Sequence, residues 1–270
     1  MSAQGAGAPS GTYPKLARAG TPPGYVHYLT TRGADVVALA PLARAVREAL
    51  AFGSLYEFAE RQYAAHAHGA RRLQGRAPVY AVTLPDGATR VVVRHSRHGG
   101  LLAPLTGDRF LAPTRAPHEL GLSHRLREAG VRTPEIVAYA LYPIAPLLFR
   151  SDVATREVPG RDLGESLRDD PDARPAMLEA TAALLRDLTR AGARHPDLNV
   201  KNVLIAPAGE GAFEAWVLDV DRVRMRTPGD PRVAAGNLER LARSARKWRA
   251  LHGVQIADAE LDRLASLAHA

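Results

Sequence analysis

Two neighbouring stretches decide the fold of this chain: "HPDLNVKN" at His195–Asn202 and "WVLDVD" at Trp216–Asp221. The apolar run "NVLIA" begins at Asn202, the second stretch is also apolar, and the Pro- and Gly-containing "PAGEGAFE" separates them. This pattern predicts an antiparallel hairpin whose open end brings Asn202 and Asp219 together. Asp197 lies on the loop that leads into the hairpin, so a carboxylate, an amide and a second carboxylate are expected to converge.

Hard oxygen ligands of this kind suit Mg²⁺, which is usually bound by one or two carboxylates together with substrate phosphates. A third carboxylate, not bound to the metal, could accept a proton from an attacking hydroxyl. Asp221 follows Asp219 by two residues, and in a strand it would point to the same side and support the metal site. The alternative is a buried polar hairpin without chemistry, which would have to hold several carboxylates together without a cation.

The two stretches resemble the catalytic loop H-R-D-L-x-x-x-N and the metal motif D-F-G of protein-kinase-like phosphotransferases. The positions that match the catalytic loop are His195, Asp197, Leu198 and Asn202. Asp219 matches the first position of the metal motif, while Val220 and Asp221 replace Phe and Gly. In such a loop the histidine orients the backbone by hydrogen bonding and is not a catalytic base.

The pattern along the whole chain agrees with this class. A β-rich segment with one helix precedes a mainly helical segment, which predicts an α+β protein with two lobes. We therefore expect a protein-kinase-like fold with a β-rich N-lobe and a mainly helical C-lobe. The expected divisions are a disordered tail over 1–24, an N-terminal extension over 25–70, the N-lobe over 71–158 and the C-lobe over 159–270.

A kinase-like N-lobe requires a cation on its third strand and a Glu on the following helix. Arg94 in "RVVVRH" occupies the position of the usual Lys, and Glu119 in "HELGLSHRL" lies on the next predicted helix. Arg retains the positive charge but is not interchangeable with Lys. Of the glycine-rich phosphate loop only Gly75 is present, with Arg76 as a further candidate for phosphate binding.

At the level of the family, the chain resembles the bacterial lipopolysaccharide kinases, and specifically 3-deoxy-D-manno-octulosonic acid (Kdo) kinase. The resembling phrases include "GRAPVY", "VVVRHSRHGGLL", "HPDLNVKNVLI", "WVLDVDRVR" and "NLERLARSARK". The resemblance implies transfer of the γ-phosphate of ATP to a hydroxyl of Kdo in the lipopolysaccharide inner core. It also implies Mg²⁺ as cofactor, a Kdo-bearing lipid A precursor as substrate, and action at the cytoplasmic face of the inner membrane.

The resemblance assigns roles to individual residues. Asp197 would accept the proton of the sugar hydroxyl, and Asn202 and Asp219 would hold Mg²⁺. Arg94, paired with Glu119, would steady the phosphates. The backbone near Glu157 and Val158, in the hinge "REVPGRDL", would meet adenine.

Composition and charge narrow the choice of partners. The chain is 46% hydrophobic and 24% charged, has no cysteine and carries a formal net charge of +8, much of it between Arg222 and Ala250. A basic surface favours anionic partners. With aromatic residues at 6% and no base-reading module, we do not expect nucleic-acid binding. The amino-terminal stretch lacks the pattern of a signal peptide, so we expect a cytoplasmic protein. Because of its basic charge and the family resemblance, we expect it to bind peripherally to an anionic membrane surface.

The basic charge is concentrated in one predicted helix, "NLERLARSARKW". Its apolar face is expected to carry Leu238, Leu241, Ala245 and Trp248, with Arg240, Arg243, Arg246 and Lys247 largely off that face. These basic residues could meet an acidic substrate or the membrane surface, with about 1 kcal/mol for each residue near the membrane. The alternative is ordinary core packing on one face and solvation on the other.

Two other functions stay open at this point. A kinase for heptose, for another small molecule or for protein would use the same Asp197 chemistry with a different acceptor. A pseudokinase, which binds nucleotide without turnover, is suggested by Arg94 and the missing glycines. The presence of Asp197, Asn202 and Asp219 argues against a pseudokinase.

Overall fold

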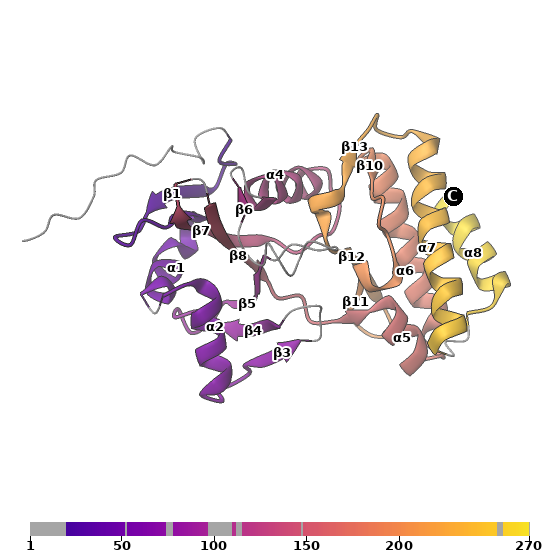
Figure 1. The fold of residues 1–270 in the computed structure, drawn as a ribbon. Helices are drawn as coiled ribbons and strands as arrows, with labels where there is room; N and C mark the ends of the chain where they lie inside the picture. Colours follow the sequence, from indigo (N-terminus) through magenta and orange to yellow (C-terminus); the bar gives the residue numbers. More distant parts are fainter. Residues whose placement is uncertain are drawn as a thin grey trace, which may run out of the picture.

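The computed structural model describes residues 20–51, 53–73, 78–96, 110–111, 115–146, 148–252 and 256–269. A sheet-rich amino-terminal part adjoins a mainly helical carboxy-terminal part (Figure 1). The α+β prediction with a β-rich first lobe and a helical second lobe is therefore confirmed. Of the predicted tail, only residues 20–24 are among those described. None of the described helices is both long and apolar enough to span a membrane.

One large antiparallel sheet forms the first lobe, in the order β1-β2-β7-β8-β5-β4-β3, with β6 also paired to β8. Its strands are β1 (Tyr25–Leu29), β2 (Asp35–Leu39), β3 (Arg71–Leu73), β4 (Val79–Thr83), β5 (Arg90–His95), β6 (Phe110–Leu111), β7 (Ile136–Ala145) and β8 (Leu148–Arg156). Because β2 pairs with β7, the segment expected as an N-terminal extension contributes two strands to this sheet.

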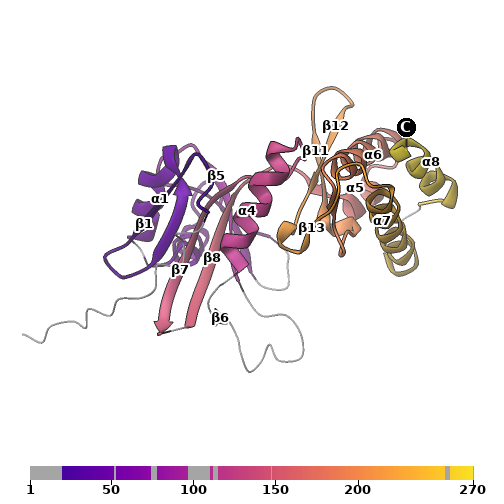
Figure 2. The same ribbon diagram turned by 90° about the horizontal axis from the view of Figure 1, so that it is seen from above.

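Helices cover both faces of the sheet. Helices α1 (Ala43–Leu50) and α2 (Leu55–Ala64) pack on one face, and α4 (Arg115–Glu128) packs on the other (Figure 2). Successive residues of a strand point to opposite faces, so Val36 belongs to the core under α1 and α2 while Val37 belongs to the core under α4. Four of the five residues of β2 are accordingly buried.

Two local features of this lobe follow from short sequence patterns, Ser54 before an apolar helix and Asp86-Gly87 between two β-rich runs. Ser54 caps α2: its side chain accepts from the Glu57 backbone N–H, and the Glu57 carboxylate accepts from the Ser54 N–H in return. Asp86 and Gly87 form the turn between β4 and β5, where the Asp86 carboxylate accepts from the N–H groups of Ala88 and Thr89. Both features depend only on residues a few positions apart, which is why sequence reasoning finds them.

The second lobe is built around one apolar core. Its helices are α5 (Leu163–Asp169), α6 (Arg174–Arg190), α7 (Pro231–His252) and α8 (Asp258–His269). Its strands are β9 (Arg161–Asp162), β11 (Val203–Pro207) and β12 (Phe213–Val217), which form one sheet, and β10 (Ala193–Arg194) and β13 (Arg224–Met225), which form another. Short 3₁₀ helices are η1 (Ala40–Leu42) in the first lobe and η2 (Val200–Asn202) and η3 (Val220–Arg222) in the second. Leu184, Leu188, Leu198 and Leu241 are fully or almost fully buried in this core.

Candidate active site

The loop His195–Asn202 connects β10 to β11 and alternates between buried and accessible positions. Leu198 and Val200 are completely buried in the core of the second lobe. Asp197 and Asn199 are partly exposed, and Lys201 is exposed. The apolar positions therefore anchor the loop, and the polar positions between them are presented toward solvent.

His195 is buried and joins the loop to the end of the hairpin. Its Nδ1 accepts from the backbone N–H of Asp197 at 3.2 Å, so the hydrogen of the neutral ring lies on Nε2, which is 3.1 Å from the carbonyl oxygen of Leu218. Burial lowers the pKa of His195 below its ordinary value, and the Leu218 carbonyl and nearby carboxylates offset this only in part. A neutral ring with both nitrogens engaged has an orienting role, as the sequence predicts.

The carboxylate of Asp197 lies at the surface, and its backbone carbonyl is fixed by hydrogen bonds. The carbonyl oxygen accepts from the side-chain amides of Asn199 at 3.0 Å and Asn202 at 2.9 Å. The Asp197 side chain is 43% exposed, and its Oδ1 accepts from Arg240 Nη2 at 2.9 Å. The carboxylate is therefore fixed in direction and still open to an incoming molecule.

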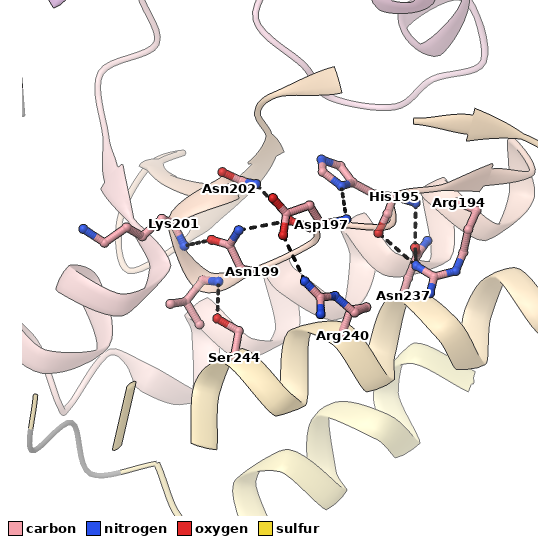
Figure 3. Close-up of polar contacts among 10 residues, drawn as sticks. Arg194, His195, Asp197, Asn199, Lys201, Asn202, Asn237, Arg240 and Ser244 are labelled. Atoms are coloured by element: carbon pink, nitrogen blue, oxygen red, sulfur yellow. Dashed lines mark hydrogen bonds and ion pairs between the residues drawn. The ribbon is translucent and has the colours of Figure 1, made fainter. Parts of the chain in front are cut away.

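One face of α7 holds this loop (Figure 3). Asn237 is buried, accepts from the His195 N–H and the Arg194 side chain, and donates to the Ala193 carbonyl. Ser244 accepts from the Val200 N–H at 3.2 Å. Positions 237, 240 and 244 share one face of the helix because they are spaced by three and four residues.

Sequence reasoning did not find these α7 residues as part of the site. It placed Arg240 off the apolar face, among basic residues that could meet an acidic substrate or the membrane surface, but it gave no sign that Arg240 contacts Asp197. The spacing of Asn237, Arg240 and Ser244 was a usable signal for a polar stripe. The loop that this stripe contacts lies more than 30 positions earlier in the chain, and the sequence of the helix alone does not predict that contact.

The hairpin prediction is confirmed for its pairing. β11 and β12 are antiparallel with Val203 opposite Val217, and Leu218 N–H donates to the Asn202 carbonyl at 2.9 Å. Asp219 is thus next to the residue that faces Asn202. The Asn202 amide nitrogen donates to Asp197, which leaves its side-chain oxygen as the atom available to a cation.

The expectation that Asp219 and Asp221 project from one strand is wrong. β12 ends at Val217, and Asp219 takes the left-handed conformation (φ 57°, ψ 43°) from which η3 begins. A residue in this conformation cannot continue a strand. Asp221 instead lies 3.6 Å from Arg115 of α4, where it links the second lobe to the first.

The predicted pair of Arg94 and Glu119 is present. Arg94 on β5 donates to the Glu119 carboxylate on α4, and Glu119 is buried. Burial would lower the pKa of Arg94, but Glu119, Asp219 and Asp221 outweigh it and the pKa is raised. Burial raises the pKa of Glu119, with Arg94 opposing. These shifts show that the acidic residues of the second lobe are within electrostatic reach of the pair.

A small cavity of about 100 Å³ lies at this junction of the lobes. Its lining includes Arg94, Glu119, Arg115 and Asp221. A second cavity of about 930 Å³ lies between the β1–β2 hairpin, α1 and α2, and contains none of the predicted site residues. Of the predicted site residues, Arg94, Glu119 and Asp221 therefore line the smaller cavity, while Asn202 and Asp219 are not part of its lining.

The carboxylate and the backbone N–H of Glu157, in the predicted hinge, both contact residues of the first lobe. Its carboxylate pairs with Arg71 of β3 and Arg90 of β5, and its N–H donates to the Arg90 carbonyl at 3.0 Å. Val158 follows it in the connection from β8 to β9. Gly75 and Arg76, predicted to bind phosphate, lie outside the described residues.

The donor set at the hairpin end fits Mg²⁺ by its chemistry. Asp219, Asp221 and Asn202 all offer oxygen, the ligand atom that Mg²⁺ prefers. Within the described part of the chain, no group of three or more His, Cys, Asp or Glu side chains is arranged to hold a metal ion. Any Mg²⁺ held here would therefore depend on the amide oxygen and on substrate phosphates as well as on carboxylates.

The protein has two lobes, and its loop with the residues of a kinase catalytic loop is held in place by α7. An Arg–Glu ion pair links the sheet to α4. Together these features define a protein-kinase-like phosphotransferase. The chain belongs to the lipopolysaccharide kinase (Kdo/WaaP) family, whose sequence model matches residues 64–266.

Individual relatives agree with this assignment. The chain is 33% identical over 195 residues to a 3-deoxy-D-manno-octulosonic acid kinase of Stenotrophomonas maltophilia, covering 70% of this chain and 74% of the relative. It is 32% identical over 178 residues to a protein of the same name from Vibrio parahaemolyticus, covering 64% and 71%. The fold is similar to the structure titled "WaaP in complex with acyl carrier protein", with a TM-score of 0.53, 22% identity and coverage of 87% and 88%.

Proposed function

We propose that this protein transfers the γ-phosphate of ATP to a hydroxyl of Kdo in the lipopolysaccharide inner core. The observation that carries the proposal is the carboxylate of Asp197, which is accessible to solvent and held in one orientation by Arg240. The chain that carries it is 33% identical over 195 residues to a protein named as a Kdo kinase. A general base must reach the proton that it removes, and this carboxylate is open to an acceptor.

The residues would divide the work as follows. Asp197 accepts the proton of the attacking hydroxyl as the new oxygen–phosphorus bond forms and ADP leaves. Asn202 and Asp219, with Asp221 nearby, would hold Mg²⁺, which when bound would neutralise charge on the phosphates. Arg94, oriented by Glu119, binds phosphate. The backbone at Glu157 and Val158 meets adenine, with Gly75 and Arg76 at the phosphates.

Contact with an anionic membrane is part of the proposal. On α7, Arg243 pairs with Glu239, and Arg246 and Arg249 pair with Asp258. Solvent screens such exposed pairs, so they stabilise the protein little, and these side chains can exchange partners for lipid phosphates. The protein would then act peripherally at the cytoplasmic face of the inner membrane.

The membrane part has its own test. Co-sedimentation with anionic vesicles should weaken in a variant carrying Arg243→Glu, Arg246→Glu and Lys247→Glu. Unchanged co-sedimentation of that variant would remove α7 as the membrane-facing surface.

The test of the function is a Mg-ATP assay on a Kdo-bearing lipid A precursor, with mass spectrometry to detect a single added phosphate. Asp197→Asn should lower turnover by about 10²–10⁴-fold, the usual contribution of a general base. Asp172→Asn, at an exposed position of the same lobe, is the matched control and should retain activity.

Each result decides between the functions considered above. A phosphorylated product that depends on Asp197 supports the proposal. ATP binding without this product would instead indicate another acceptor, such as heptose or protein. Binding of ATP with no turnover on any acceptor would indicate a pseudokinase.

A further inference from the structure

The guanidinium of Arg240 lies beside the carboxylate that would receive the acceptor's proton, with Nη2 2.9 Å from Asp197 Oδ1. We propose that Arg240 is an acceptor-binding residue that recognises the carboxylate of the sugar acid. Asp197 then accepts the proton of the sugar's hydroxyl. This inference rests on the proposed function and adds to it a subsite for the acid group.

Distance places the acceptor near Arg240. A hydroxyl that gives its proton to Asp197 must come within about 2.6–3.2 Å of that carboxylate. Because Arg240 already contacts the same carboxylate, any such acceptor lies within a few ångströms of the guanidinium. The Asp197 side chain is 43% exposed and that of Arg240 is 33% exposed, so both are accessible to a molecule at this loop.

The donor chemistry of Arg240 suits a carboxylate. A guanidinium has five N–H groups in a planar fork that matches a carboxylate in a bidentate arrangement. The contact with Asp197 uses Nη2, and Nε is buried without a hydrogen-bond partner among the described residues. Because Nε is buried, it cannot reach an incoming molecule, and the donor capacity left for a ligand is that of the terminal Nη groups beyond the contact with Asp197.

The local charge balance also favours an incoming anion. Arg194 of β10 is close to Arg240: burial lowers its pKa, and repulsion from Arg240 lowers it further, while Glu239 opposes both. Glu239 is itself exposed and paired with Arg243. Two guanidiniums therefore flank the loop, and the Asp197 carboxylate balances only one of them. An anionic acceptor would balance the remaining positive charge, and a neutral sugar would not.

Arg194 is less suited to bind the acceptor itself. Its Nη1 already donates to the His195 carbonyl and to the Asn237 side chain. An added Cβ on Gly236 would lie 2.5 Å from Arg194 Nε, so α7 packs tightly against this side chain. Arg194 therefore contributes charge from a fixed position, and Arg240 is the residue that offers donors to a ligand.

The experiment compares two soluble acceptors that differ only in charge: the methyl glycoside of Kdo and the methyl ester of its carboxyl group. For the wild-type protein we expect kcat/KM to be at least about tenfold higher for the acid, the usual effect of a charge-assisted hydrogen bond. In Arg240→Gln this preference should fall to about one, mainly through a higher KM for the acid. Arg240→Lys, which keeps the charge but not the fork, should retain part of the preference.

The control is Arg232→Gln, an exposed position of the same helix, which should keep both activity and the preference. If Arg240 only positions Asp197 or contacts the transferred phosphoryl group, Arg240→Gln will lower kcat equally for acid and ester and the preference will persist. That result would overturn the inference.

If Arg240→Gln has no turnover, the affinity for the Kdo glycoside and for its methyl ester is measured by calorimetry instead. Weaker binding of the acid with unchanged binding of the ester supports the inference, and equal binding of the acid by wild type and variant overturns it. If the wild-type protein phosphorylates neither compound and also fails on the lipid-linked acceptor, the proposed function itself has failed.

Discussion

Arg94 of β5 and Glu119 of α4 form an ion pair across the interface between the sheet and helix α4, which packs on one face of it. Asp221 lines the same small cavity from the other lobe. The Arg94–Glu119 pair of the first lobe and Asp221 of the second lobe therefore line one cavity.

Replacement of Glu119 by Gln should weaken ATP binding. The amide can still accept from Arg94, but the charge that holds the guanidinium is lost, so KM for ATP should rise by about tenfold or more. Steady-state kinetics with varied ATP measures this. Glu128→Gln, on the same helix but exposed and paired only with His124, is the control and should leave KM unchanged.

Asp219 allows its backbone role to be separated from its carboxylate. Because Asn and Gly both tolerate its left-handed conformation, Asp219→Asn and Asp219→Gly should fold normally. Both should lose at least about tenfold in the Mg²⁺-dependent part of ATP binding, measured by calorimetry with and without the metal. Asp219→Ala should in addition lose about 1 kcal/mol of unfolding free energy through strain. Undiminished Mg-ATP binding by Asp219→Asn would argue against a metal-binding role.

His195 should make the stability of the protein depend on pH. Its pKa is lower in the folded protein than in the unfolded chain, where it is about 6.5, so below that pH the unfolded chain binds more protons. The unfolding free energy should therefore fall on acidification below about pH 6.5, until the pH reaches the folded-state pKa. The slope for one such proton is at most about 1.4 kcal/mol per pH unit.

Urea unfolding between about pH 5 and 7 measures this slope. His195→Asn should have a shallower slope than the wild-type protein. His66→Asn, at an exposed position where Asn tolerates the left-handed backbone, should keep the wild-type slope. Equal slopes for wild type and His195→Asn would contradict the prediction.

Gly160 and Gly121 should respond to alanine in opposite directions. A Cβ at Gly160 would lie 2.4 Å from the Ile205 carbonyl oxygen, so Gly160→Ala would force β9 away from β11 and cost about 1–3 kcal/mol. A Cβ at Gly121, within α4, would meet nothing within 4 Å, so Gly121→Ala should stabilise the protein by about 0.5–1 kcal/mol. Thermal unfolding of the two variants measures both signs in one experiment.

The amino-acid sequence by itself determined the local geometry of this protein. The cap at Ser54, the turn at Asp86 and the hairpin that brings Leu218 against Asn202 all depend on residues close together in the chain. Short-range hydrogen bonding and period-two alternation are sufficient to encode them. The pairing of Arg94 with Glu119 followed from the order of motifs in a known class.

Tertiary structure alone decided which distant segments meet. The β1–β2 hairpin pairs with β7, about 100 residues later, because alternation identifies the faces of a strand but not its neighbour. Asn237 and Arg240 reach the loop of Asp197 only because α7 packs against the same core that buries Leu198. A helix with polar residues off its apolar stripe has the same pattern whether that side faces water or an active site, and only packing distinguishes the two.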